Sequence, residues 1–269
     1  MHVVTVASLK GGVGKTTTAH TLGTLLAANR RVLLVDMDPQ ASLTRMCGVR
    51  DVAGRSMAEV LGLTSGGVAL RDIIRPLGHS LAIAPAHSAL VGTEIALALR
   101  AGRETLLKNA LDTVASHRRW PRLLARQRNS SYDVALVDTP PSLGLLTVNA
   151  LVAADGILIP IVPETIAWES LRLLMDKIDQ VRRAFNPRLK IIGVLPTFYD
   201  SRLLHHRAVV EGMRATGLPV LDVTVGRSIR VAEAAEHGQT VVSYDPANKR
   251  SAEYWVLARV VEGWLEDRE

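Results

Sequence analysis

The sequence predicts an α/β fold, with a mainly parallel, twisted sheet covered by helices on both faces, in one domain that spans residues 1–269. Apolar residues make up 48% of the chain but aromatic residues only 4%. The core must therefore consist of Val, Leu, Ile and Ala, as in parallel strands buried between helices. Short β-branched runs also alternate with helix-period stretches, which is typical of βαβ units. No linker rich in Pro, Ser and Gly divides the chain.

This alternation places each expected element. Strands are expected at His2–Ala7, Arg31–Asp36, Leu81–Pro85, Tyr132–Asp138, Gly156–Ile161 and Leu189–Pro196, with a weaker one at Thr240–Tyr244. Helices are expected at Lys15–Ala28, Ser88–Arg100, Glu104–Ser116, Leu143–Ala153, Ile166–Phe185, Leu203–Thr216 and Ala247–Trp264. In the last helix an apolar stripe at helical spacing is expected to pack in the core; its residues are Trp255, Val256, Val260 and Trp264. Because the first strand begins at residue 2, we expect no N-terminal helix-turn-helix module.

A glycine-rich loop joins the first expected strand to the first helix. Its residues are Lys10, Gly11, Gly12, Val13, Gly14, Lys15, Thr16 and Thr17. Glycines let the backbone curl so that its N–H groups point at phosphates, and the helix N-terminus adds its positive end. Lys15 would then reach the β- and γ-phosphates, and the Thr16 hydroxyl would coordinate Mg²⁺. The pattern predicts a P-loop NTPase.

The loop departs from the standard P-loop pattern at its start. That pattern places a glycine at residue 9, where this chain has Leu9, and a second lysine, Lys10, follows. In this the sequence resembles the ParA/MinD family of deviant Walker-A ATPases, and within it the ParA/Soj-type partitioning ATPases. The resemblance implies ATP and Mg²⁺ as ligands, a low intrinsic rate of hydrolysis, and an ATP-bound homodimer in which Lys10 contacts the nucleotide of the other subunit. It makes Lys10, Lys15 and Asp38 the expected catalytic residues.

Two expected strands end in aspartates. Asp36 ends the second strand, Asp38 follows it, and Asp138 ends the fourth; the carboxyl ends of parallel strands share one edge with the P-loop. A carboxylate there can position water or support Mg²⁺. By the resemblance, Asp38 orients the attacking water in switch I, Asp36 lies nearer the metal, and Asp138 is the Walker-B carboxylate. The expected metal-site residues are thus Thr16, Asp36, Asp38 and Asp138. Thr139–Ser142 resembles switch II, and Ser142 is also expected to cap the next helix.

The resemblance covers essentially the whole chain. Leu195–Arg202 and Val241–Pro246 resemble the segments that flank the adenine in this family. It therefore implies nucleotide contacts from Pro196, Thr197, Asp245 and Pro246.

The net charge of +6 favours either a polyanionic partner or a solvated basic surface. ParA-like dimers bind DNA without sequence preference, and the resemblance makes six C-terminal residues candidates: Arg202, Arg207, Arg227, Arg230, Lys249 and Arg250. A denser basic run at residues 117–128 could also contact DNA, but we favour a solvated helix or loop there. His205 and His206 lack partners at metal-ligand spacing and are expected on the surface.

We expect a DNA-partitioning ATPase, cytoplasmic and nucleoid-associated, with a ParB-like centromere-binding partner and no membrane partner. The alternatives are a MinD-like membrane-positioning ATPase, another cargo-positioning ATPase, or a metabolic relative. The acidic end, Glu266–Glu269, suits anionic lipid poorly. A single cysteine, Cys47, is too few for an iron–sulfur protein, and no substrate motif of an ATP-dependent ligase is found.

Overall fold

The computed structural model describes residues 1–52, 54–62, 67–115 and 132–268. Across these residues seven strands form one sheet in the order β3-β4-β2-β5-β1-β6-β7, and all neighbours are parallel except β3 and β4. The strands are β1 (His2–Val6), β2 (Val32–Asp36), β3 (Arg75–Pro76), β4 (Leu81–Ala84), β5 (Val134–Asp138), β6 (Gly156–Ile161) and β7 (Lys190–Pro196). The helices are α1 (Lys15–Leu26), α2 (Ser42–Met46), α3 (Met57–Val60), α4 (Leu70–Ile73), α5 (Leu90–Ala96), the 3₁₀ helix η1 (Arg103–Thr105), α6 (Leu106–Ala115), α7 (Leu145–Ala153), α8 (Ala167–Ala184), α9 (Leu204–Ala215), α10 (Ile229–Glu236), α11 (Val241–Tyr244) and α12 (Lys249–Glu266).

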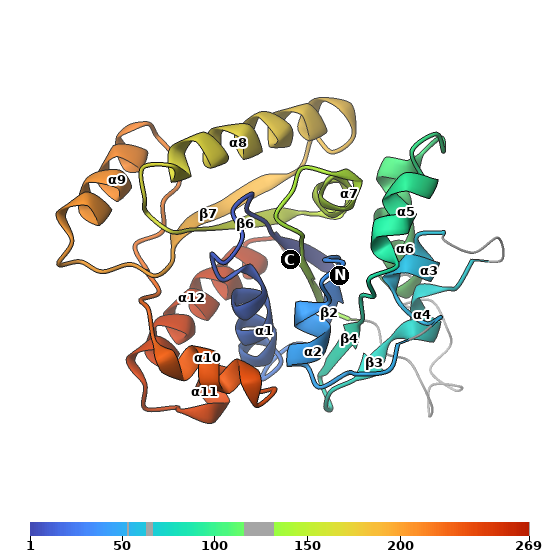
Figure 1. Cartoon of the computed structure of the whole chain (residues 1–269), viewed down its shortest axis with the longest axis horizontal. Helices are drawn as coiled ribbons and strands as arrows, with labels where there is room; N and C mark the ends of the chain where they lie inside the picture. The colour runs from blue at the N-terminus through green and yellow to red at the C-terminus, as the bar shows by residue number, and fades with distance from the viewer. Residues whose placement is uncertain (53, 63–66, 116–131, 269) are drawn as a thin grey trace.

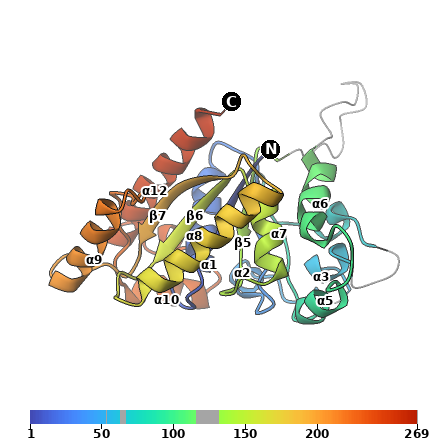
Figure 2. The same cartoon turned by 90° about the horizontal axis from the view of Figure 1, so that it is seen from above.

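Helices cover both faces of the sheet. In Figure 1, α8 lies along one side of the sheet, and α1 and α12 lie on the other. Figure 2 shows α8 crossing β6 and β7. The mainly parallel α/β fold predicted from the sequence is confirmed.

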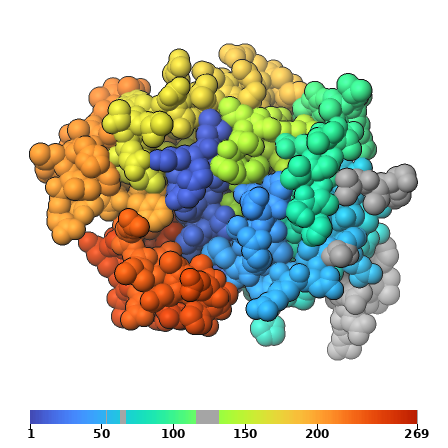
Figure 3. All heavy atoms as spheres, viewed as in Figure 1, coloured from blue at the N-terminus to red at the C-terminus, as the bar shows by residue number. Residues whose placement is uncertain are grey.

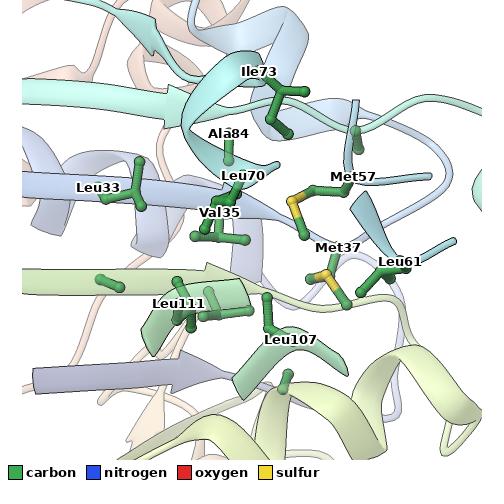
Figure 4. Packing of buried hydrophobic residues seen from close by; sticks show 14 of the residues in the cluster. Leu33, Val35, Met37, Met57, Leu61, Leu70, Ile73, Ala84, Leu107 and Leu111 are labelled. Atoms are coloured by element: carbon green, nitrogen blue, oxygen red, sulfur yellow. The ribbon is translucent and has the colours of Figure 1, made fainter. Parts of the chain in front are cut away.

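The core explains why the central strands are apolar on both sides. In β2, Leu33 and Val35 contribute to a cluster with residues of α3, α4 and α6, which Figure 4 shows from close by. Val32 and Leu34 point to the opposite face and join a cluster with α1 and α12. Successive side chains of a strand alternate between faces, so a strand covered by helices on both sides is apolar along its length. In β2 the first polar residue is Asp36, the last residue of the strand.

One expected strand is wrong. Residues Val241–Tyr244 form the helical turn α11, in which the N–H groups of Ser243 and Tyr244 both donate to the carbonyl of Thr240. Val241 is buried in the cluster that α12 joins, so packing against helices overrides the β-propensity of the segment. The short elements β3, α2, α3, α4 and α10 were not predicted, because few-residue elements give almost no periodic signal.

Two expectations about helices are also wrong. Helix α12 buries Tyr254, Leu257, Val261 and Leu265, which leaves Trp255, Val256 and Val260 exposed at 48%, 49% and 37%; only Trp264 of the expected stripe packs against the core. The apolar stripe lies beside the buried face and not within it.

Ser142 does not cap α7. The helix begins at Leu145 after Gly144, without a side-chain cap. The basic run at 117–128 lies outside the described residues.

Candidate nucleotide site

No other part of the described chain covers the backbone of the glycine-rich loop at Gly11, Gly12 and Gly14. Gly12 and Gly14 have positive φ, at 72° and 86°, a conformation that costs glycine little. A Cβ added at Gly11, Gly12 or Gly14 would meet no atom within 4 Å. Gly14 precedes α1 without a side-chain cap, so the first N–H groups of the helix remain available to an anion. The loop therefore has the form of a phosphate cradle.

Lys15 lies over this cradle in a buried position. Its Nζ donates to the carbonyl of Lys10 at 3.2 Å, and the residue is 6% exposed. Burial lowers the pKa of Lys15, while the charges of Asp138 and Asp38 raise it. The lysine thus lies within electrostatic reach of both carboxylates, between the loop and the carboxyl ends of the strands.

Asp138 is a buried carboxylate that lacks partners. It is fully buried at the end of β5, and among the described residues neither of its oxygens has a hydrogen-bond partner. It is paired in register with Asp36 on β2. Burial, and next the charge of Asp36, raise the pKa of Asp138 well above its usual range, while the Thr16 side chain, which is nearby but outside hydrogen-bond geometry, and the charge of Lys15 oppose this shift. An orphaned buried carboxylate beside a phosphate cradle fits a site that receives a divalent cation.

Asp36 and Asp38 have different surroundings. Asp36 accepts hydrogen bonds on both oxygens, from the Asp38 N–H at 3.1 Å and from the N–H and hydroxyl of Thr44 at 2.8 and 2.7 Å. Burial raises the pKa of Asp36 to about 6. Asp38 accepts the Gln40 N–H on Oδ1 at 2.9 Å and is 9% exposed. Asp36 is thus engaged by the chain itself, whereas the second oxygen of Asp38 accepts no hydrogen bond seen among the described residues.

The described residues contain no group of three His, Cys, Asp or Glu side chains that could hold a metal by themselves. Mg²⁺ usually takes one or two protein ligands and completes its shell with water and phosphate. Of the four expected metal-site residues, Asp138 is a fully buried carboxylate without a hydrogen-bond partner among the described residues, and the Thr16 side chain lowers its pKa.

Lys10 points away from its own loop. Its Nζ lies 2.5 Å from Oε2 of Glu164, which follows β6, and the two side chains are 37% and 48% exposed. The hydrogen bond from Lys10 and its charge lower the pKa of Glu164. This pair was not predicted from the sequence, because the two residues are far apart in the chain and a glutamate before a helix has no distinctive pattern.

A small, mostly apolar pocket adjoins the cradle. It is lined by Gly14 and Thr17 of the loop and by Thr197, Phe198, Val225, Gly226, Ser228, Val231 and Tyr254. Phe198 has the left-handed φ of 49°, and the Thr197 hydroxyl donates to the Val13 carbonyl at 2.8 Å. The pocket has a volume of about 30 Å³ and adjoins the cradle at Gly14 and Thr17.

The expected nucleotide contacts relate to this pocket differently. Thr197 lines it, whereas Pro196 is the buried last residue of β7. Asp245 and Pro246 are not among its lining residues. Asp245 instead accepts a hydrogen bond from Asn248 at the start of α12.

The six basic DNA candidates lie on α9, α10, the start of α12 and the segments between them. These elements occupy the left part of the face in Figure 3, beside the dark blue P-loop region at its centre. Arg202 is 87% exposed and bound to Asp200 through two nitrogens, and Arg230 pairs with Glu233. Arg207, Arg227 and Lys249 are exposed. Arg250 is 13% exposed and paired with Glu253, so it is the least accessible of the six.

The histidine pair is only partly on the surface. His205 is exposed, but His206 is 6% exposed, and its Nδ1 accepts the Asp200 N–H at 3.1 Å. The expectation of two surface histidines is wrong for His206. This residue of α9 stacks its ring on that of Tyr199, which precedes the helix.

Comparison with known proteins decides the family. Residues 1–191 match the family model described as an AAA domain. Chromosome partitioning protein ParA of Caulobacter vibrioides is 38% identical over 100% of this chain and 97% of its own length. The chain belongs to the ParA/MinD type of P-loop ATPases.

Other members are similar over nearly their whole length. Chromosome-partitioning ATPase Soj of Thermus thermophilus is 37% identical over 98% of this chain and 96% of its own. The crystal structure of cobyrinic acid a,c-diamide synthase from Mycobacterium smegmatis with bound ATP analog and magnesium is 34% identical, covers 98% of this chain and 96% of that chain, and has a TM-score of 0.79. The family assignment and the fold class predicted from the sequence are both confirmed. Among the described residues, no helix is long and apolar enough to cross a membrane.

Proposed function

We propose that this protein is an ATP-dependent partitioning switch. It binds ATP with Mg²⁺, forms a homodimer in the ATP state, binds DNA without sequence preference, and is released when a ParB-like partner stimulates hydrolysis. The observation that carries the proposal is the pair of lysines in one loop. Lys15 is buried over the phosphate cradle, whereas Lys10 is exposed and points out of it. The partitioning names of the ParA and Soj relatives support the same function.

The residues divide the work at the nucleotide. The N–H groups of Gly11–Thr17 and the ammonium of Lys15 hold the phosphates. The Thr16 hydroxyl and, directly or through water, the Asp138 carboxylate hold Mg²⁺, which neutralises charge on the phosphates. Asp38 orients the attacking water with its remaining oxygen. Hydrolysis is slow in the isolated protein, because a switch must persist long enough for a partner to detect its state.

Lys10 ties ATP to the dimer. Its bond to Glu164 keeps the ammonium at the solvent-exposed rim and not over its own cradle. An exposed ion pair contributes only about 0–1 kcal/mol, so the lysine can exchange Glu164 for a phosphate of the facing subunit. Dimerisation would then bring two sets of the basic residues of α9, α10 and α12 onto one surface. Binding of that surface to the DNA backbone is electrostatic and falls steeply with salt. In the cell the protein would be cytoplasmic and nucleoid-associated.

The test is DNA binding by the purified protein with ATP, with ADP and without nucleotide, at two salt concentrations. Wild type should bind random-sequence DNA only with ATP and lose it at the higher salt. Lys10→Ala should abolish DNA binding while it retains ATP binding. Lys190→Ala is the matched control. Lys190 carries the same charge but begins β7, at the edge of the sheet opposite to the P-loop, so this variant should behave as wild type. Binding that ignores the nucleotide would contradict the proposal, as would full activity of Lys10→Ala.

A second candidate is an ATP-dependent ligase, favoured by the 34% identity to cobyrinic acid a,c-diamide synthase. A ligase would release ADP in step with an acceptor and an amine donor, and DNA would have no effect. Binding to anionic vesicles in place of DNA would instead favour the membrane-positioning alternative.

A further inference from the structure

Thr44 forms a buried hydrogen-bonded bridge behind the candidate catalytic loop. It lies in the first turn of α2 and is 2% exposed. Its hydroxyl donates to Oδ2 of Asp36 at 2.7 Å and accepts the N–H of Ala86 at 2.9 Å. Its own N–H donates to the same Asp36 oxygen at 2.8 Å. One side chain therefore joins the end of β2 to the segment that follows β4.

The bridge continues to Asp38. The other oxygen of Asp36 accepts the Asp38 N–H at 3.1 Å, and Asp38 in turn accepts the Gln40 N–H. The loop then closes through the carbonyl of Asp38, which accepts the N–H of Ala41 at 2.8 Å. An unbroken series of hydrogen bonds thus runs from the Ala86 backbone through Thr44 and Asp36 to the backbone of Asp38.

This arrangement gives Asp36 a different task from Asp138. Both carboxylates are fully buried and adjacent in register. Asp138 has no hydrogen-bond partner among the described residues, whereas three protein donors satisfy Asp36. A carboxylate with both oxygens bonded to its own chain is held in one orientation and is poorly available to a metal.

We infer that Thr44 is a positioning residue for hydrolysis, acting through Asp36 to fix the direction of Asp38. The inference rests on the proposed ATPase function. Removing the Thr44 hydroxyl leaves the Asp36 carboxylate with one donor fewer. It also leaves the buried N–H of Ala86 without its acceptor. The Asp38 backbone is then free to turn, and small displacements of a catalytic group are expensive in rate.

The experiment compares Thr44→Val, which keeps the shape, with Thr44→Ser, which keeps the hydroxyl. Thr93→Val is the matched control, because Thr93 is equally buried but its hydroxyl donates only to the Ala89 carbonyl of its own helix. Single-turnover hydrolysis, binding of a fluorescent ATP analogue, the Mg²⁺ dependence and amide exchange of residues 38–41 are measured on each protein. Urea unfolding shows which variants are folded; should Thr44→Val not fold, Thr44→Ala takes its place.

Thr44→Val should lose roughly ten- to a hundredfold in single-turnover rate, with the Kd for the ATP analogue and the Mg²⁺ midpoint unchanged and with faster exchange at residues 38–41. Thr44→Ser should recover most of the rate, and Thr93→Val should keep it. Added to Asp38→Ala, Thr44→Val should cause no further loss, since both act through one group.

Three results would overturn the inference: an undiminished rate in Thr44→Val, no recovery in Thr44→Ser, or a displaced Mg²⁺ midpoint, which would place Asp36 in the metal shell. If wild type itself hydrolyses no ATP, the proposed function fails with it, and that result is visible before any variant is compared.

Discussion

His20 should make folding of this protein sensitive to acid. It lies in α1 and is 5% exposed, and its Nδ1 has no hydrogen-bond partner among the described residues. Burial lowers the pKa of His20 from 6.5 to about 4. The native state therefore holds the imidazole neutral in a range where the unfolded chain protonates it.

The size of the effect follows from proton linkage. Between pH 6.5 and about pH 4 the unfolded chain binds more protons at His20 than the native state does, so stability falls as the pH is lowered through this window. The loss from this one group is about 2 kcal/mol between pH 7 and pH 5, and about 3 kcal/mol between pH 7 and pH 4.

Asp36 acts in the opposite direction. Burial raises its pKa from 3.8 to about 6, so the native state binds more protons than the unfolded chain, and stability increases as the pH falls through that window. The pH profile of wild type alone therefore mixes opposing terms, since the raised pKa of Asp138 acts in the same direction as that of Asp36. The difference between wild type and a variant without the histidine isolates the term due to His20.

The assay is urea unfolding of nucleotide-free wild type and His20→Leu at pH 7, 6 and 5. The advantage of His20→Leu over wild type should grow by about 2 kcal/mol from pH 7 to pH 5. Thr21→Val is the control: Thr21 is buried in the same helix and does not titrate, so its difference from wild type should not depend on pH. A His20→Leu difference that stays constant with pH would show that His20 is solvated or paired in solution, and the argument would be refuted.

Three further predictions concern packing and the site. Gly23→Ala should destabilise the protein by about 1–3 kcal/mol in urea unfolding, because its Cβ would lie 2.5 Å from a buried leucine of β2; Gly263→Ala, with no atom within 4 Å of its added Cβ, should be neutral or stabilising. Asp138→Asn should raise the urea midpoint of the nucleotide-free protein at pH 7, because it replaces a buried carboxyl group whose ionisation burial opposes, and should weaken Mg²⁺-dependent nucleotide binding roughly tenfold or more; a lower midpoint with unchanged binding would contradict the proposed role. Glu164→Gln should leave folding unchanged and lower the ATP concentration for half-maximal dimerisation by up to about fivefold, measured by light scattering, whereas a requirement for more ATP would mean that Glu164 helps to place Lys10.

The parts of the fold that were predictable have strong local signals. Strands β1, β2, β5, β6 and β7 are continuous apolar runs because both faces of the sheet are covered, and such runs stand out in any sequence. The P-loop was predictable because a backbone that must curl around phosphates needs glycines at fixed positions. The carboxylates Asp36 and Asp138 were predictable as neighbours because the ends of parallel strands meet at one edge.

What failed depends on contacts between distant segments. Val241–Tyr244 has the composition of a strand, but it packs against helices and no strand pairs with it in the described residues. The Trp255 stripe has helical spacing, but the face that α12 buries is set by its packing against α1 and the core cluster they share. The partner of Lys10 is Glu164, and the bridge from Thr44 reaches Ala86; neither pairing follows from spacing along the chain.

Three aspartates at one edge of the sheet show how surroundings assign different tasks to the same side chain. Asp36 has three donors and holds the loop, Asp38 has one donor, on Oδ1, and Asp138 has none among the described residues. Leaving a buried carboxylate without a partner costs several kcal/mol, a cost that folding does not remove and a bound cation can. Mg²⁺ with nucleotide should therefore stabilise wild type more than it stabilises Asp138→Asn. The unfavourable burial of Asp138 in the absence of a cation thus favours binding of Mg²⁺ beside it.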